Sequence, residues 1–274
     1  LLYKDVLDLV KNTDKLINSY TIDSDVYRIN QNAGFVPIQV NPETFFLIEK
    51  AIEFGYDSDG IFDITFSPLQ DCYGFNDKNY KLPTPTELKN SLELVNFRLI
   101  ELDKEYGTVF LPNTKMKINL SGISKGYILD KITDFLIQRN LNDFTVDFGG
   151  NLSVYKENPI LVGIENKAYS RIKENLSIDK GFISTSSGSH QFFTQDGVRY
   201  THIVNPKTGM ASSTISSATV KTWSGLESDF LSTYFFLVGE KPCQSMIKKY
   251  LAQSSVYLFN KEGNFIVFKD NDRT

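Results

Sequence analysis

The chain has 274 residues, of which 41% are hydrophobic and 23% charged, a composition typical of a globular protein with a sizeable core. Its net charge of −4 and pI near 5.4 argue against a protein that binds a nucleic-acid backbone, because such proteins present a basic face. No run of about 18 apolar residues occurs, so the sequence predicts no membrane span.

The first part of the chain is predicted to be mainly helical. Apolar residues recur at helical spacing over residues 1–20, and the Asn41-Pro42 pair predicts the start of a second helix that ends near Tyr56. A polar loop over 74–86 leads into a third helix of about ten residues. Short strands are then expected at 99–102, 109–111 and 116–120.

The remainder alternates irregularly between helices and strands. Helices are predicted at 123–139, 226–237 and 242–251. Strands are predicted at 144–155, 160–164, 181–184, 199–204 and 216–222, with an exposed lysine-rich stretch before residue 181 and a final hairpin of 255–259 and 264–269. Because strict βαβ alternation is absent, we expect an α+β fold, in a single domain that covers 1–274.

The beginning of the chain and its cysteines give further expectations. The sequence opens in an amphipathic segment without an initiator Met, so we expect its natural start to lie upstream. No signal peptide is visible, and a removed signal or a lipid anchor upstream is compatible with the sequence. Cys72 and Cys243 fit no metal-binding spacing and are predicted to be free thiols.

The run NLSGISKG at residues 119–126 carries the first candidate site. It joins a predicted strand to a predicted helix, its small residues allow close backbone approach to an anion, and Lys125 adds a positive charge. The GxxxxGK[ST] spacing of a Walker loop is absent. The run predicts a phosphate cradle, with an ordinary strand-to-helix turn and a surface lysine as the alternative.

A second candidate lies at residues 227–233, at the start of a predicted helix. Asp229 and Thr233 are four residues apart and therefore share one helical face. A carboxylate and a hydroxyl from one turn suit a hard cation such as Mg²⁺, which often completes its shell with phosphate and water. The alternative is that Asp229 stabilises the helix N-terminus while Thr233 faces solvent.

Three weaker candidates complete the set. Asp147 precedes a Gly-Gly break and is either a ligand residue or part of a turn. His202 is one of two histidines, and an isolated histidine is often structural. The hydroxyl-rich residues 183–188 either bind phosphate or satisfy their own turn. The absence of GxGxxG, HExxH and CxxC excludes a Rossmann fingerprint, a zinc protease and a thioredoxin.

Taken in order, these segments resemble the ApbE family of FAD:protein FMN transferases over nearly the whole chain. The segments that carry the resemblance are 24–34 (SDVYRINQNAG), 59–69 (DGIFDITFSPL) with YGF at 73–75, 119–126 (NLSGISKG), 146–150 (VDFGG), 186–193 (SSGSHQFF), 202–209 (HIVNPKTG) and 228–233 (SDFLST).

The resemblance implies a T-fold-like α+β architecture with mixed or antiparallel sheets and packed helices. It implies Mg²⁺-dependent transfer of FMN from FAD to a Ser or Thr hydroxyl of an acceptor protein, with release of AMP. It also implies a location outside the cytoplasm, with an anchor on the outer face of the cytoplasmic membrane. A pyrophosphatase that hydrolyses FAD and a non-enzymatic flavin-binding protein are the alternative functions.

Site residues follow from the same resemblance. The cation is assigned to Asp229, Thr233 and the carbonyl of Gly122, with Ser232 beside them, and Asp229 and His202 are the candidate catalytic groups. His202 is placed near the diphosphate as a base or an orienting group. Contacts with FAD are assigned to Tyr20, Ile61, Phe62, Asp63, Asn119, Lys125 and the backbone at Val204.

The chain departs from the family pattern at several of these segments. Asn119 stands where the family has aspartate, so one negative charge is missing close to the expected diphosphate and cation. Asn205 also stands where the family has aspartate. Tyr73 replaces a tryptophan, and Ser121 replaces the first glycine of a pair. Altered use of the metal, or hydrolysis in place of transfer, is the consequence to be tested.

Overall fold

The structure, a computed structural model, describes residues 2–166, 171–211 and 214–268. Its chain forms two compact units. The first unit consists of Leu1–Gly122 and Phe193–Ala211, and the second of Ile123–Phe192 and Ser212–Thr274. The expectation of one domain over 1–274 stays a prediction.

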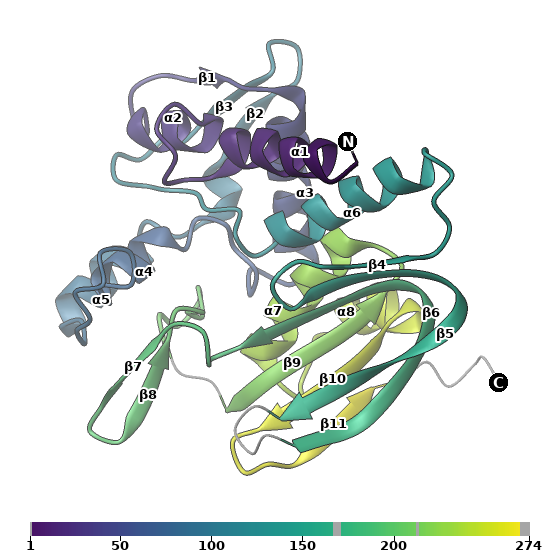
Figure 1. The fold of residues 1–274 in the computed structure, drawn as a ribbon. Coiled ribbons are helices and arrows are strands. Elements are labelled where there is room, and N and C mark those ends of the chain that lie inside the picture. Colours follow the sequence, from purple (N-terminus) through teal and green to yellow (C-terminus); the bar gives the residue numbers. More distant parts are fainter. Residues whose placement is uncertain (1, 167–170, 212–213, 269–274) are drawn as a thin grey trace. The chain divides into compact units, whose positions relative to one another are not determined.

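The first unit is mainly helical, as the periodicity predicted. Its helices are α1 (Leu2–Ile17), α2 (Asp25–Gln31), α3 (Pro42–Asp57), α4 (Ser67–Cys72) and α5 (Pro85–Leu92), with a 3₁₀ turn at Phe97–Leu99 (Figure 1). A small antiparallel sheet has the order β1 (Ile38–Gln39), β3 (Thr108–Phe110), β2 (Glu101–Asp103), and β7 (Phe192–Gln195) pairs with β8 (Val198–Thr201).

Local capping explains where the predicted helices begin. The Asn41 side chain accepts a hydrogen bond from the Glu43 N–H, with a proline in the first turn of α3. At α5, Thr84 and Glu87 form a reciprocal capping box. Both signals are local in sequence, and both predicted helix starts are confirmed within two residues.

The strand predicted at 116–120 is wrong. The Asn30 amide donates to the Ile118 carbonyl at 2.9 Å and accepts from the Ile118 N–H at 2.8 Å. The Asn119 N–H donates to the Ile64 carbonyl at 2.8 Å. A side chain thus occupies the hydrogen-bonding groups that a neighbouring strand would need. The strand predicted at 99–102 begins only at Glu101, because residues 97–99 form the 3₁₀ turn.

The second unit contains a six-stranded antiparallel sheet with the order β11-β10-β9-β6-β5-β4. Its strands are β4 (Phe144–Asp147), β5 (Asn151–Asn166), β6 (Arg171–Ser187), β9 (Ile215–Thr222), β10 (Ser255–Asn260) and β11 (Phe265–Phe268). Its helices are α6 (Ser124–Ile137), α7 (Gly225–Val238) and α8 (Gln244–Tyr250), and a 3₁₀ turn follows at Leu251–Gln253. The predicted ends at Leu1 and Lys269 lie outside the described residues.

The long β5–β6 hairpin corrects the expected exposed loop before residue 181. The two strands curve together along most of their length (Figure 1). Leu176 and Ile178 alternate with polar residues and pack with Val154, so the segment has strand periodicity despite its lysines. Charged side chains on the exposed face masked that periodicity in the sequence.

The architecture confirms the predicted α+β class with antiparallel sheets and packed helices. Cys72 and Cys243 are free thiols, as predicted. Within the described ranges, none of the helices combines the length and apolarity that a membrane crossing requires. The predicted site residues lie in α6 and α7 and in loops of the first unit.

Candidate functional site

The predicted site residues are distributed over both units. The first unit holds Tyr20, Ile61, Phe62, Asp63, Asn119, Gly122, His202 and Val204. The second unit holds Lys125, Asp229, Ser232 and Thr233. Each group is described within its own unit.

In the second unit, the first turns of α6 and α7 meet at two glycines. A Cβ atom on Gly126 would overlap the carbonyl oxygen of Gly225, and a Cβ on Gly225 would overlap the carbonyl oxygen of Gly126. Only glycine permits this approach of two backbones. The last residue of the predicted cradle is therefore a helix-crossing point.

Each of these helices supplies a carboxylate to the N-terminus of the other. Asp229 of α7 accepts a hydrogen bond from the Gly126 N–H at 2.9 Å. Asp130 of α6 accepts from the Gly225 N–H at 2.6 Å and from the Leu226 N–H at 2.8 Å. Helix N-termini favour negative charge, so both contacts stabilise the crossing. The Asp229 contact supplies α6 with the cap that it lacks, since its own N-cap residue makes no side-chain bond.

Burial removes water from the two carboxylates, and this desolvation disfavours their charged forms. Burial raises the pKa of the Asp229 carboxyl, whereas the nearby Lys125 cation and the backbone N–H groups lower it. Burial raises the pKa of Asp130 to about 6, against the backbone N–H groups that it accepts from. Only 4% of the Asp229 surface is exposed. A cation at Asp229 would therefore favour the ionised carboxylate.

Buried hydroxyl pairs join these helices to the sheet. Ser184 of β6 lies 2.7 Å from Ser228 of α7, measured between hydroxyl oxygens, and Ser186 lies 2.8 Å from Ser232 and 3.3 Å from Thr233. Two of the four hydroxyls of residues 183–188 thus bond to α7, a role that neither sequence interpretation includes. Thr185 bonds to Thr219 of β9, and Ser187 bonds to Ser189 beside it in sequence.

The two neighbouring hydroxyls of α7 differ in how fully they are used. Ser232 is completely buried and donates to the Asp229 carbonyl at 2.9 Å, in addition to its contact with Ser186. Thr233 is only half-buried and has the longer contact with Ser186. Of the predicted cation ligands in this unit, Asp229 and Thr233 are therefore the two that are chemically available.

A residue that the sequence reasoning did not select lies in the same unit. Asn151 is 1% exposed, and neither its amide nitrogen nor its amide oxygen has a hydrogen-bond partner. It nevertheless lies near enough to Asp229 to favour the charged carboxylate, although the pair lacks ordinary hydrogen-bond geometry. Asp147, for which a ligand role and a turn were the two interpretations, is exposed and accepts from the Gly150 N–H at 3.2 Å, which is the turn alternative.

The donor set of the second unit fits a hard divalent cation. It combines the buried carboxylate of Asp229 with the half-buried hydroxyl of Thr233. Oxygen donors of this kind suit Mg²⁺, which also takes phosphate and water. Across the described ranges, no cluster of three or more His, Cys, Asp and Glu residues is placed to hold a metal. A cation held by so few protein donors has coordination positions left for the phosphate oxygens of a substrate.

In the first unit, the loop that contains Asp63 is organised by that side chain. One carboxylate oxygen accepts from the Thr65 N–H at 2.7 Å and from the Thr65 hydroxyl at 2.6 Å, and the other accepts from the Phe97 N–H at 3.0 Å. Burial raises the pKa of Asp63, and these bonds oppose the rise. Phe62 is buried and packs edge-on against Phe54, whereas Ile61 is half-buried. The predicted contact of Asp63 with FAD thus concerns a carboxylate that already has a structural role.

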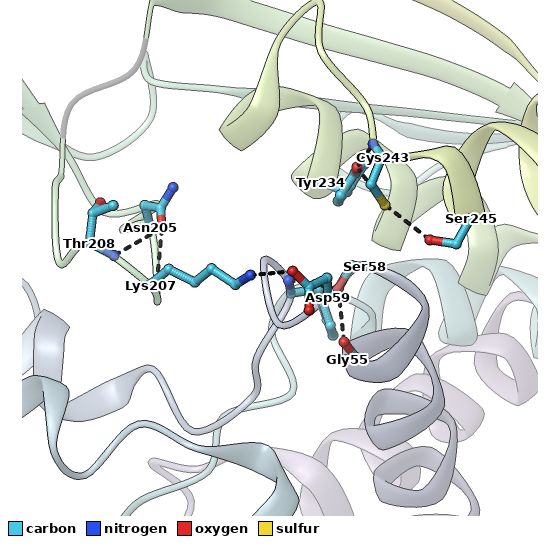
Figure 2. A network of polar contacts seen from close by, with 10 residues as sticks. Gly55, Ser58, Asp59, Asn205, Lys207, Thr208, Tyr234, Cys243 and Ser245 are labelled. Carbon is cyan, nitrogen blue, oxygen red and sulfur yellow. Dashed lines mark hydrogen bonds and ion pairs between the residues drawn. The ribbon is translucent and has the colours of Figure 1, made fainter.

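The HIVNPKTG segment forms a turn, where a strand to Val204 was predicted. Strand β8 ends at Thr201, and Val204 is buried in an apolar cluster. The Asn205 side-chain oxygen accepts from the Lys207 N–H at 2.9 Å and from the Thr208 N–H at 3.2 Å (Figure 2). An amide oxygen is sufficient for these bonds, so Asn in place of Asp preserves the turn.

Three contacts attach this turn to the segment 59–75 of the same unit. The Lys207 ammonium donates to Asp59 at 2.6 Å (Figure 2). The Gln70 amide donates to the His202 carbonyl at 2.8 Å, and the Tyr73 hydroxyl donates to the Gly209 carbonyl at 2.9 Å. Tyr73 therefore supplies a hydroxyl bond at the position where the family has tryptophan. The His202 side chain is half-buried beside this anchored backbone.

Asn119 and Tyr20 are also in the first unit. Asn119 is buried, its side-chain oxygen accepts from the Ser121 N–H at 2.8 Å, and its own N–H donates to the carbonyl of Ile64, the residue after Asp63. The Tyr20 side chain is 63% exposed, and its hydroxyl donates to Asn76 at 2.6 Å. The structure therefore brings Asn119 close to the Asp63 loop and leaves Tyr20 at the surface.

Comparison with known proteins extends over nearly the whole chain. The sequence profile of the ApbE family matches residues 2–258. A protein from Klebsiella pneumoniae named FAD:protein FMN transferase is 28% identical over 243 residues, which are 88% of this chain and 77% of that protein. Its namesake from Haemophilus influenzae is 26% identical over 282 residues, covering 98% of this chain and 81% of that protein.

Solved structures give the same result for the fold. The crystal structure of the ApbE protein from Thermotoga maritima has a TM-score of 0.89 and 25% identity, covering 97% of this chain and 88% of that one. The flavin transferase ApbE from Vibrio cholerae has a TM-score of 0.84 and 25% identity, covering 98% and 88%.

Proposed function

We propose that this chain, which belongs to the ApbE family, transfers the FMN half of FAD to a Ser or Thr hydroxyl of an acceptor protein with the help of Mg²⁺. One observation carries the proposal: the buried Asp229 carboxylate lies at the crossing of two helix N-termini, within a chain that matches the family profile almost throughout. The relatives' names supply FAD and the protein acceptor.

The proposed reaction breaks the phosphoanhydride bond of FAD and forms a phosphoester bond to the acceptor. The acceptor hydroxyl oxygen attacks the phosphorus of the FMN half, the bond from that phosphorus to the bridging oxygen breaks, and AMP leaves with that oxygen. The hydroxyl proton passes to a base, for which His202 is the candidate. Such transfers depend mainly on positioning and on stabilising charge.

Asp229 and Thr233 would hold Mg²⁺, and the resemblance adds the Gly122 carbonyl. The cation would neutralise the diphosphate and favour departure of AMP. Lys125 adds a positive charge beside Asp229. The Gly126 N–H is already bonded to Asp229, so we assign anion binding to Lys125 and exclude this first-turn N–H from it.

The test follows the flavin. The full chain is mixed with FAD, Mg²⁺ and an extract containing acceptor proteins, and the products are separated by denaturing gel and by chromatography. Flavin fluorescence that stays on a protein band supports transfer. Free FMN without labelled protein indicates hydrolysis, and unchanged FAD indicates a flavin-binding protein, and either result contradicts the proposal.

Two variants test the role of the cation. Asp229→Asn keeps an oxygen that accepts from the Gly126 N–H but removes the charge, and we expect it to lose at least about 100-fold in transfer rate. Asp147→Asn is the matched control, because Asp147 is an exposed carboxylate in the same unit. Transfer that persists in Asp229→Asn and in EDTA would exclude the proposed metal site.

A further inference from the structure

Asn151 is a buried amide without a partner in a part of the protein where other polar groups are paired. Its relative exposure is 1%, and both polar atoms of its side chain are unsatisfied. Leaving a buried polar group unpaired costs about 1–3 kcal/mol. Neighbouring buried hydroxyls, such as Ser153 and Ser184, avoid that cost by bonding to α6 and α7. An unpaired amide beside them calls for an explanation.

Sheet geometry gives the direction of this side chain. Asn151 is the register partner of Ser184 in the antiparallel pair β5–β6, so the two side chains lie on the same face of the sheet. Ser184 reaches Ser228 of α7 on that face. Ser153, two residues along β5, shares the face and reaches Thr133 of α6 at 2.6 Å. The Asn151 amide therefore points toward the two helices that cross beside Asp229.

The Asp229 carboxylate is the charged group that the amide meets there. One of its oxygens accepts from the Gly126 N–H, and the Asn151 amide favours its ionised form. A carboxamide has donors on nitrogen and an acceptor on oxygen, so it is able to serve a carboxylate and a cation-bound water at the same time. Groups that orient metal ligands in this way are a regular part of metal sites.

We propose that Asn151 is a positioning residue of the cation site: its amide nitrogen donates to Asp229 and its oxygen accepts from a water on the bound divalent cation. The inference rests on the proposed function, since it takes Asp229 as the cation ligand. It adds a group that the family resemblance did not assign, and it gives both unsatisfied atoms of this buried amide a partner.

The test measures cation binding directly, with Mn²⁺ as the probe. The full chain is titrated with Mn²⁺, with and without saturating FAD, and free Mn²⁺ is read from its electron paramagnetic resonance signal. We expect Asn151→Ala to weaken Mn²⁺ binding by about 10- to 100-fold. Asn151→Asp, which keeps an acceptor oxygen, should recover at least part of that loss.

Ser153→Ala is the matched control, because it removes a buried polar group from the same face of β5 but not from the site. We expect it to lower thermal stability and to leave Mn²⁺ affinity within about twofold of the wild type. Thermal unfolding of each variant establishes that it is folded. Equal Mn²⁺ affinity of Asn151→Ala and wild type, both with and without FAD, would overturn the inference.

Asp229→Ala distinguishes this inference from the proposal beneath it. If Asp229→Ala binds Mn²⁺ as well as the wild type does, the metal role in the proposed function fails. If Asp229→Ala loses Mn²⁺ while Asn151→Ala keeps it, only the role of Asn151 fails. Loss in both variants, with binding intact in Ser153→Ala, supports both statements.

Discussion

At the scale of single residues, the two asparagines that replace family aspartates are satisfied as hydrogen-bond acceptors. Asn119 accepts from the Ser121 N–H, and Asn205 accepts from two N–H groups of its turn. In both cases the oxygen shapes the local backbone. The substitutions therefore preserve structure while removing charge, and their effect should be sought in cation and phosphate binding.

Asn205 allows these two contributions to be separated. Asn205→Asp keeps the acceptor oxygen and adds a charge near Lys207, so its unfolding free energy should stay within about 0.5 kcal/mol of the wild type. Asn205→Ala loses both hydrogen bonds, and we expect a loss of about 1–2 kcal/mol. Urea unfolding measures both values. Equal destabilisation by the two variants would show that the acceptor oxygen is unimportant.

Ser232 and Thr233 are adjacent hydroxyls for which the structure predicts different roles. Ser232→Ala should cost about 1 kcal/mol of stability, because its hydroxyl bonds to Ser186 and to a backbone carbonyl. Its Mg²⁺ requirement in the FMN-transfer assay should be unchanged. Thr233→Val preserves shape and removes the hydroxyl, so it should raise the Mg²⁺ concentration needed for half-maximal transfer by about tenfold. The opposite pattern would assign the cation to Ser232.

At the scale of elements, the candidate site of the second unit lies at the crossing of α6 and α7. The crossing needs two glycines for close approach and two carboxylates for capping, and each carboxylate comes from the opposite helix. Asp229 thus has a structural role at α6 as well as its proposed role toward a cation. This dual use accounts for its burial.

Asp130 gives the crossing a dependence on pH. The pKa of the Asp130 carboxyl is about 6 in the folded protein and 3.8 in an unfolded chain. The folded state therefore holds this proton more tightly than the unfolded state does. The stability that the protonated Asp130 carboxyl contributes to the folded protein is fully present below pH 3.8. It is lost as the pH rises through about 6 and the carboxyl ionises. Between these limits the wild type should lose up to about 3 kcal/mol relative to Asp130→Asn, which does not titrate.

Chemical unfolding of wild type and Asp130→Asn at intervals from about pH 4 to 7 measures this difference. Asp147→Asn serves as a control, since Asp147 is exposed. A stability difference that is constant with pH, or that grows in favour of the wild type as pH rises, would contradict the assignment.

The close contact between Gly126 and Gly225 is tested by a substitution that adds a Cβ atom. Gly126→Ala places a Cβ against the Gly225 carbonyl and the Asp229 side chain, and neither backbone has room to move without separating the helices. We expect a loss of at least about 3 kcal/mol. Gly107→Ala is the comparison, because that site is open and only its positive φ of 62° opposes a side chain. Its expected cost is about 1 kcal/mol.

Local signals predicted the elements well, and partners distant in sequence account for the errors. The Asn41 and Thr84 caps lie within three residues of the N–H groups that they satisfy, and α3 and α5 were found from them. Asn30 occupies the backbone at Ile118 from 88 residues away, and Asp130 caps α7 from 95 residues away. No periodicity or motif contains such pairings.

The candidate site residues show the same difference between local sequence signals and partners distant in sequence. Asp229 was selected because its spacing to Thr233 is a property of one helix. The sequence does not identify Asn151 as a candidate, because its burial depends on a sheet face covered by two helices that are distant in sequence. The only sequence signal was a polar residue directly after a Gly-Gly turn.

At the scale of the whole molecule, each compact unit contains residues assigned to FAD or to its cation, and the family profile matches residues 2–258. The stability of a folded protein rises when a ligand binds only its native state, by RT ln(1 + [L]/Kd). Binding of FAD and Mg²⁺ to the native protein should therefore raise its stability against unfolding, and this effect is independent of any acceptor. It separates ligand binding from transfer.

Thermal unfolding of the full chain with FAD tests this linkage. With FAD and Mg²⁺ at about 100 times their dissociation constants, we expect about 2.7 kcal/mol of added stability, or a Tm increase on the order of 5–10 °C. EDTA should remove most of the increase, and Asp229→Asn should show little difference between Mg²⁺ and EDTA. Ser153→Ala, although less stable, should keep the full Mg²⁺-dependent increase. An FAD-induced shift that is the same with Mg²⁺ and with EDTA would mean that the flavin binds without the cation, and that Asp229 serves only to cap α6.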